Sequence, residues 1–135
     1  MALNSAERVL ERMLSGMEEP ATQQLTLYIP DKDKDDNRIE SLDNWIKQAQ
    51  AMLTSIGGGT TSLPPADGTW LNEESNETIY EKTKIIYTYV YPDRLAENLA
   101  SLREFLHRFG RETNQGEVVF EFNGRFYRIR KYDPK

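Results

Sequence analysis

The sequence predicts an α+β fold in which two amphipathic helices cover one face of an antiparallel sheet. Two segments repeat apolar residues at steps of three and four, the period of a helix. Several shorter segments alternate apolar and polar residues, as strands do. The last two of these flank Asn123-Gly124, a pair that favours the tight turn of a β-hairpin.

The 135 residues are enough for one domain with its own core. We expect a helix and linker over residues 1–22 and a single α+β domain over residues 23–135. Asn4 and Glu7 have the spacing of a capping box, and Gly16 follows the apolar stripe of this first helix. We expect the helix to pack on the domain or on a partner protein.

The domain is expected to open with a strand and a helix. Gln24 to Ile29 alternates apolar and polar residues, and Pro30 ends the strand. From Ile39 to Ile56 one apolar stripe recurs at helical spacing, and the glycines at 57–59 end the helix.

Three strand segments are expected in the middle of the chain. Thr60 to Leu63 and Thr69 to Leu71 are short and lie on either side of an Asp67-Gly68 turn. Thr83 to Tyr91 is the strongest strand, and both of its faces carry large apolar side chains.

A second helix and a hairpin complete the domain. Pro92 suits the first turn of a helix, whose stripe runs from Leu95 to Phe109, and Gly110 is expected to end it. The hairpin strands are Glu117 to Phe122 and Arg125 to Arg130.

In chain order these elements read α-β-α-β-β-α-β-β. We therefore expect a ferredoxin-like βαββαβ sandwich with an extra N-terminal helix and a C-terminal β-hairpin. The run LREFLHRFGRETNQGEV, followed by a short hairpin, resembles a set of small bacterial α+β proteins without an assigned activity. The resemblance covers about Gln24 to Tyr132, and it implies a fold but no reaction.

The composition removes several kinds of chemistry. Because the chain has no cysteine and one histidine, it can hold neither a thiolate nucleophile nor a multi-histidine metal site. The acidic loop Asp31 to Arg38 has alternating carboxylates, as calcium loops do. However, Asp36 stands where that loop needs glycine and Leu42 where it needs glutamate. We expect neither a metal nor a cofactor.

Charge and hydropathy bear on location and partners. The acidic residues Glu7 and Glu11 interrupt the first apolar segment, which is wrong for a signal peptide. No apolar run reaches membrane-spanning length. The formal charge of −5 does not favour nucleic-acid binding. We therefore expect a cytoplasmic protein without a membrane partner.

The densest polar chemistry follows the second helix. Imidazole, guanidinium, carboxylate and amide groups gather there and could hold an anionic ligand. The alternative is that the cations only stabilise the end of the helix. Trp70, at the end of a proline-rich loop, is a further candidate for ligand contact. The candidate ligand-binding residues are His107, Arg108, Arg111, Glu112, Asn114 and Trp70.

The sheet face away from the helices is expected to carry aromatic side chains. A second copy of the chain could cover this face, because a large exposed apolar patch favours association. Single-stranded RNA is the alternative occupant, although the RNA-recognition consensus is missing. The candidate interface residues are Tyr28, Tyr87, Tyr89, Phe120 and Phe122.

No motif identifies a specific reaction. We expect a small binding or accessory protein that acts as a homodimer. The first alternative is a dimeric ferredoxin-like enzyme with an anionic substrate, in whose pocket His107, Arg111, Glu81 or Trp70 takes part. The second alternative is RNA binding on the open sheet face.

Overall fold

The computed structural model describes residues 4–17 and 23–135. Within them the chain forms three helices and a six-stranded antiparallel sheet, so the predicted mixture of helices and sheet is confirmed. Helix α1 spans Ser5–Leu14. Residues 1–3 and most of the predicted linker, residues 18–22, lie outside the described residues.

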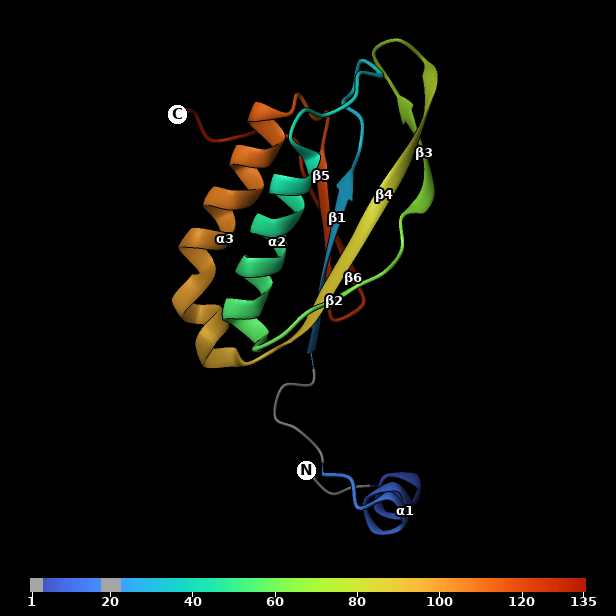
Figure 1. Ribbon diagram of the computed structural model, residues 1–135, viewed down its shortest axis with the longest axis vertical. Coiled ribbons are helices and arrows are strands. Elements are labelled where there is room, and N and C mark those ends of the chain that lie inside the picture. The colour runs from blue at the N-terminus through green and yellow to red at the C-terminus, as the bar shows by residue number, and fades with distance from the viewer. Residues whose placement is uncertain (1–3, 18–22) are drawn as a thin grey trace.

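The sheet has the order β2-β4-β1-β5-β6, and β3 pairs with the outer part of β4. Figure 1 shows β4 running past β1 and on to β3, so that this one long strand pairs with β1, β2 and β3. The strands are β1 (Gln23–Pro30), β2 (Thr61–Ser62), β3 (Ala66–Asn72), β4 (Glu77–Val90), β5 (Val118–Phe122) and β6 (Arg125–Ile129).

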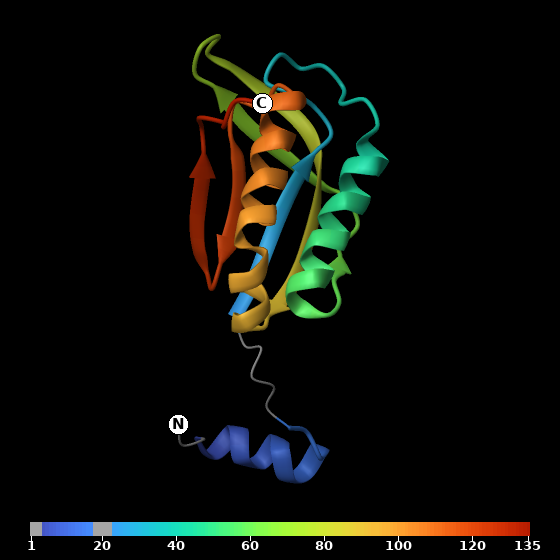
Figure 2. The same cartoon turned by 90° about the vertical axis from the view of Figure 1, so that its left-hand side faces the viewer.

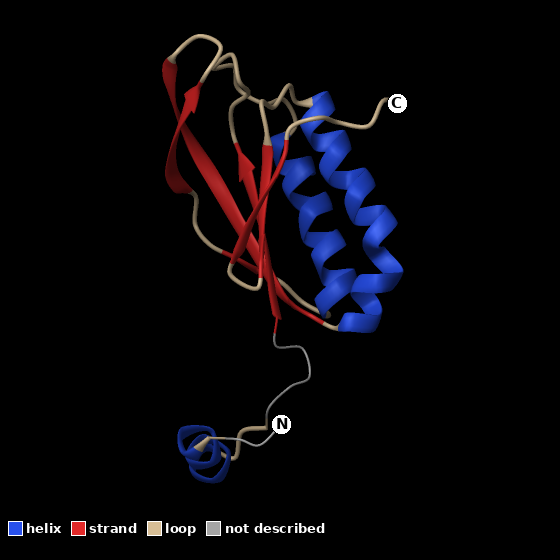
Figure 3. Cartoon of the chain, turned by 180° about the vertical axis from the view of Figure 1, so that it is seen from behind, coloured by secondary structure: helices blue, strands red, loops and turns tan. Residues whose placement is uncertain are grey.

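Helices α2 (Leu42–Gly57) and α3 (Pro92–Glu112) lie side by side on one face of the sheet, as Figures 2 and 3 show. The core lies between the two layers. Leu27 of β1 and Ile86 of β4 pair across the ladder and are buried. Leu53 of α2 and Phe109 of α3 are fully buried in the same core. The other face of the sheet has no helix over it among the described residues.

The β5–β6 hairpin matches its sequence signal. Asn123 and Gly124 form its turn with φ angles of 52° and 78°. Both angles are positive, as a type I′ turn requires, and Gly124 takes this conformation without a steric penalty.

Strand β4 begins at Glu77, earlier than the predicted start at Thr83. The outer half of β4 pairs with β3 along its whole length, from Ala66↔Thr83 to Asn72↔Glu77. Most residues of β4 before Lys84 are polar, so the apolar alternation that marks a half-buried strand is weak there. Cross-strand pairing with β3 therefore extends the strand beyond its apolar part.

Helix α3 continues through Gly110 to Glu112, so the prediction that Gly110 ends the helix is wrong. Gly110 is buried, and the ring of Tyr132 lies where a Cβ on this residue would be. The glycine therefore allows the C-terminal segment to approach the helix closely.

Helix α1 forms with the predicted cap. The Asn4 side chain accepts a hydrogen bond from Glu7 N (2.9 Å), and Glu7 Oε2 accepts one from Asn4 N (2.8 Å). None of the α1 residues is buried. In the part of the chain that the structure describes, no helix has both the length and the apolar character needed to cross a membrane.

Candidate functional site

A pocket opens where β1 and β5 separate. The two strands pair only from Leu25↔Phe122 to Leu27↔Phe120, whereas β1 pairs with β4 as far as Pro30. Beyond Leu27 the β5 side of β1 has no strand partner within residues 4–17 and 23–135. The resulting gap is bordered by the β3–β4 hairpin on one side and the β5–β6 hairpin on the other.

The pocket has a cavity volume of about 320 Å³, at the lower end of the range typical of small-ligand sites. Aromatic rings come from three strands: Tyr28 from β1, Trp70 from β3 and Phe126 from β6. The pocket reaches the core residues Phe109 and Val118. Flat apolar walls of this kind suit a ligand with a ring system.

Glu81 supplies a partly buried carboxyl group to this pocket. It lies on β4 opposite Gly68, and its Oε2 atom is buried without a hydrogen-bond partner in the described residues. Burial, and then the negative charge of Asp31, raises the pKa of Glu81 to about 7. A hydrogen bond from the Trp70 side chain and the positive charge of Lys32 offset only part of this rise. The carboxyl is therefore partly ionised near neutral pH and lacks a strong cationic partner.

The opposite wall carries charges that already have partners. Glu117 Oε2 lies 3.7 Å from Arg128 Nε and 3.4 Å from Arg130 Nε. The Arg128 guanidinium also lies over the Phe126 ring, 5.1 Å from its centroid. Glu117 is thus neutralised locally, in contrast to Glu81.

Tyr28 joins the floor of the pocket to β5. Its hydroxyl donates a hydrogen bond of 2.6 Å to Glu121 Oε1. Burial, followed by the bond to Glu121, raises the pKa of Tyr28 to about 12. The phenol therefore keeps its proton, and stays a hydrogen-bond donor, over the whole physiological pH range.

The predicted polar cluster at the end of α3 lies outside the lining of this pocket. The Arg108 guanidinium lies over the Trp45 ring, 5.0 Å from its centroid, and donates a bond of 2.6 Å to Gln48 Oε1. It also lies 3.9 Å from Glu112. Arg111 Nη1 donates to the backbone oxygen of Asp133 (2.6 Å). The two arginines thus make contacts within the chain, and their role toward an anionic ligand stays a prediction.

The other two members of the cluster also have partners within the chain. His107 is buried, and its Nδ1 accepts a hydrogen bond of 2.8 Å from Asp133 N. Asn114 Nδ2 donates to Asp35 Oδ2 (2.8 Å) and lies 3.3 Å from Asp33 Oδ2 in the acidic loop. Of the six candidate ligand-binding residues, Trp70 is the one that lines the pocket.

The acidic loop is held by local hydrogen bonds. Asp33 Oδ1 accepts bonds from Asp35 N (2.8 Å) and Asn37 N (2.9 Å). Partial burial raises the pKa of Asp33, but these bonds and that from Asn114 outweigh it, so the pKa is lower than usual. Lys32 pairs with Asp36 (3.0 Å). Among the described residues no three His, Asp or Glu side chains converge to hold a metal ion.

The five candidate interface residues divide between the two faces. Tyr28 and Tyr87 alternate along their strands with the core residues Leu27 and Ile86, so they lie on the face away from the helices. Tyr89 is half exposed (50%). Phe122 and Phe120 pair with Leu25 and Leu27 and pack against the core on the helix side. Their position follows from the register of β5 against β1, which the sequence does not show.

Glu117 is a pocket residue that the sequence did not single out. Gln115 belonged to the polar run at the end of the second helix but was not among the candidate ligand-binding residues, and Glu81 was only one of several alternatives. The alternation of Ile85 and Tyr87, extended backwards, places Thr83 and Glu81 on the same face. This alternation could therefore have placed Glu81 on the open face of the sheet from the sequence. The contribution of Gln115 depends on how α3 meets β5, for which the sequence offers no signal.

The fold is similar to that of a known enzyme. One solved structure is a phage SAM lyase in complex with S-methyl-5′-thioadenosine, with a TM-score of 0.63 and 10% identity, covering 86% of this chain and 95% of that one. A phage SAM lyase in the apo state has a TM-score of 0.57 and 11% identity, covering 89% and 99%. No protein-family model and no curated protein matches the sequence. At these identities the similarity shows a shared fold.

Proposed function

We propose that this protein is a small-molecule enzyme that binds S-adenosylmethionine in the pocket between the two hairpins and cleaves it as a lyase. The observation that carries the proposal is the Glu81 carboxyl, partly buried in a pocket with aromatic walls, whose buried Oε2 atom has no hydrogen-bond partner in the described residues. The fold shared with phage SAM lyase supports the choice of ligand.

The electrostatics favour a cationic ligand. A buried carboxylate is costly unless a positive charge lies next to it, and a bound cation would supply that charge. S-adenosylmethionine carries a sulfonium and an ammonium group beside a flat adenine ring. Glu81 would face the ammonium group, which keeps its charge throughout the reaction, while Trp70 and Phe126 offer ring surfaces for the adenine.

The proposed reaction needs no water, metal or second substrate. The bond between sulfur and the methionyl Cγ breaks, and its electron pair stays on sulfur to give neutral S-methyl-5′-thioadenosine. The substrate's own carboxylate oxygen forms a bond to Cγ, which gives homoserine lactone. A positive and a negative charge disappear together, so a pocket with apolar walls favours the transition state over the charged substrate.

Calorimetric titration with S-adenosylmethionine and with S-methyl-5′-thioadenosine tests the binding site. Glu81→Gln should weaken binding of the cationic substrate about tenfold or more, because a charge-assisted contact is lost. Binding of the neutral thioether should change by less than about threefold. Glu77→Gln, on the exposed outer end of the same strand, is the matched control and should change neither affinity.

Turnover is followed by chromatography of S-methyl-5′-thioadenosine released from S-adenosylmethionine, without added cofactor. Release that falls in Glu81→Gln and persists in Glu77→Gln supports the proposal. The proposal fails if the wild-type protein binds neither compound. It also fails if Glu81→Gln and the wild type bind and cleave S-adenosylmethionine equally well.

We also propose that a second copy of the chain covers the open sheet face beside the pocket. Tyr89 is 50% exposed, Leu63 is 40% exposed, and the rings of Tyr87 and Tyr89 meet edge to face at 6.1 Å. Neighbouring apolar groups of this kind favour association. Light scattering at micromolar concentration should report a dimer that Tyr89→Ser weakens. A monomeric wild type would contradict the proposal. A binding or accessory role would then have to use another surface.

We further propose that the domain belongs to the ferredoxin-like class. The support is that β4 and β5 flank β1, and that α2 and α3 follow β1 and β4 on the same face of the sheet. An experimental structure in which β1 pairs with other neighbours would overturn this assignment.

A further inference from the structure

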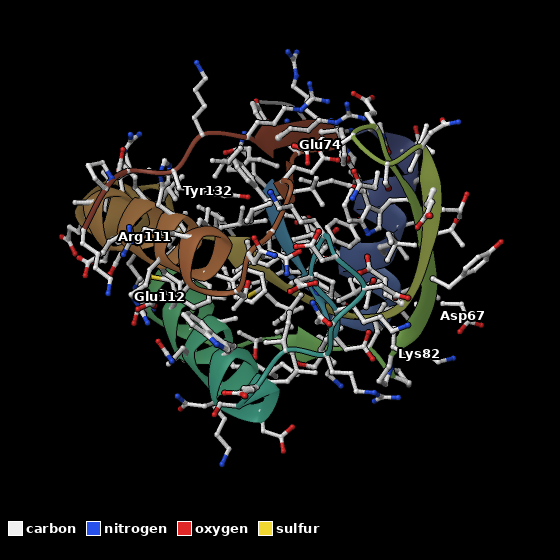
Figure 4. All side chains as sticks on the ribbon, turned by 90° about the horizontal axis from the view of Figure 1, so that it is seen from above. Asp67, Glu74, Lys82, Arg111, Glu112 and Tyr132 are labelled. Atoms are coloured by element: carbon white, nitrogen blue, oxygen red, sulfur yellow. The ribbon has the colours of Figure 1, made fainter. Side chains whose placement is uncertain are left out.

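The C-terminal segment, residues 130–135, lies against the second half of α3. The Tyr132 ring occupies the space that a side chain on Gly110 would need, and it meets His107 edge to face at 6.2 Å. Figure 4 shows Tyr132 and Arg111 close together at this end of the molecule, away from Asp67 and Lys82 of the β3–β4 hairpin. The helix thus has a notch shaped for this ring.

Asp133 holds the segment to the helix. Its carboxylate accepts two hydrogen bonds of 2.8 Å from the Arg103 guanidinium. Its backbone N–H donates to His107 Nδ1 (2.8 Å), and its backbone oxygen accepts from Arg111 (2.6 Å). Three residues spaced by one helical turn therefore grip one residue of the segment.

Tyr132 connects this clamp to the pocket. Its hydroxyl donates a hydrogen bond of 2.9 Å to the backbone oxygen of Gln115. Burial, followed by the charge of Glu117, raises the pKa of Tyr132 to about 12, so the hydroxyl keeps its proton. Gln115 and Glu117 both line the pocket. The contact therefore reaches the wall opposite Glu81.

Gln115 is fixed at its other groups as well. Its backbone N–H donates to Gly110 O (3.0 Å), and its Nε2 donates to Lys32 O (3.1 Å) in the loop after β1. The residue is buried, so an unpaired backbone oxygen there would be costly. Tyr132 supplies the one bond to this oxygen that the described residues contain.

We propose that Tyr132 is a positioning residue, by which the C-terminal segment, clamped to α3, holds the Gln115–Glu117 wall of the pocket in its binding geometry. The consequence for ligand affinity rests on the proposed function. A wall that is already ordered loses less conformational entropy when a ligand binds, and this improves affinity without a direct contact.

Tyr132→Phe tests the proposal because it keeps the ring in the Gly110 notch and removes the hydroxyl alone. Amide hydrogens of residues 115–118 should exchange about 3- to 10-fold faster than in the wild type. Affinity for S-methyl-5′-thioadenosine should fall by about 3- to 10-fold. Tyr80→Phe, an exposed tyrosine on β4, is the matched control and should change neither quantity.

The two measurements separate this inference from the function on which it rests. Unchanged exchange at residues 115–118 overturns the proposal, whatever the ligand. Faster exchange with unchanged affinity, in a protein that binds S-methyl-5′-thioadenosine, overturns the positioning role. If the wild type does not bind this compound, the proposed function fails, and the exchange rates still decide whether Tyr132 holds the wall.

Discussion

Replacing Glu81 by glutamine should stabilise the empty protein, and the gain should grow with pH. In the unfolded chain this carboxyl has its ordinary pKa of 4.5, whereas burial and Asp31 raise the folded value to about 7. Below pH 4.5 the group is protonated in both states and makes no difference between them. As the pH rises from 4.5 to 7, the unfolded chain releases its proton first, so the folded wild type loses relative stability.

The size of the effect follows from the two pKa values. The rise from 4.5 to about 7 corresponds to roughly 3 kcal/mol at full burial. The side chain is only partly buried, and solvent screening reduces this to roughly 1–2 kcal/mol. For a chain of this length the difference amounts to about 3–10 °C in Tm.

Chemical denaturation of the wild type, Glu81→Gln and Glu77→Gln at pH 5 and pH 8 measures this directly. Glu81→Gln should differ little from the wild type at pH 5 and gain roughly 1–2 kcal/mol at pH 8. Glu77→Gln is the control for the loss of one negative charge on the same strand. A gain in Glu81→Gln that is equal at both pH values, or absent at pH 8, would refute the reasoning.

Four further outcomes are expected. Leu53→Ala in the core should cost about 2–5 kcal/mol in chemical denaturation. Gly57→Ala should cost about 1–3 kcal/mol by the same measurement, since a Cβ there would overlap Thr88. Arg111→Ala should lower stability by about 0.5–1.5 kcal/mol and leave thermal shifts with phosphorylated metabolites unchanged. Calorimetric titration of the protein with calcium should show no saturable binding at the acidic loop, residues 31–38, below about 1 mM.

Local chemistry made most of the elements predictable. The helical stripes of α2 and α3 and the alternation in the inner half of β4 each come from side chains that one face must bury. The Asn123-Gly124 turn and the Asn4 cap depend on backbone conformations and hydrogen bonds within a few residues. Features of this kind are visible in a sequence because their causes lie close together along the chain.

Long-range contacts explain the elements that differed from prediction. The outer half of β4 exists because β3 pairs with it. Gly110 lies inside α3 because Tyr132, distant in sequence, packs against it. The sequence does not distinguish a glycine that ends a helix from one that lets a neighbouring ring pack against the helix. Only the presence of the packed ring shows which role the glycine has.

The pocket is the part that depends most on the assembled structure. The alternation within β1 and β4 allowed Tyr28 and Tyr87 to be placed on the open sheet face, whereas Phe120 and Phe122 pack against the core on the other face. Three things required the fold: the separation of β1 from β5, the burial of Glu81 and the position of Gln115. The pKa of Glu81 rises because segments far apart in the chain exclude water from its carboxyl. Desolvation is a property of surroundings, and the surroundings of a side chain exist only once the chain has folded.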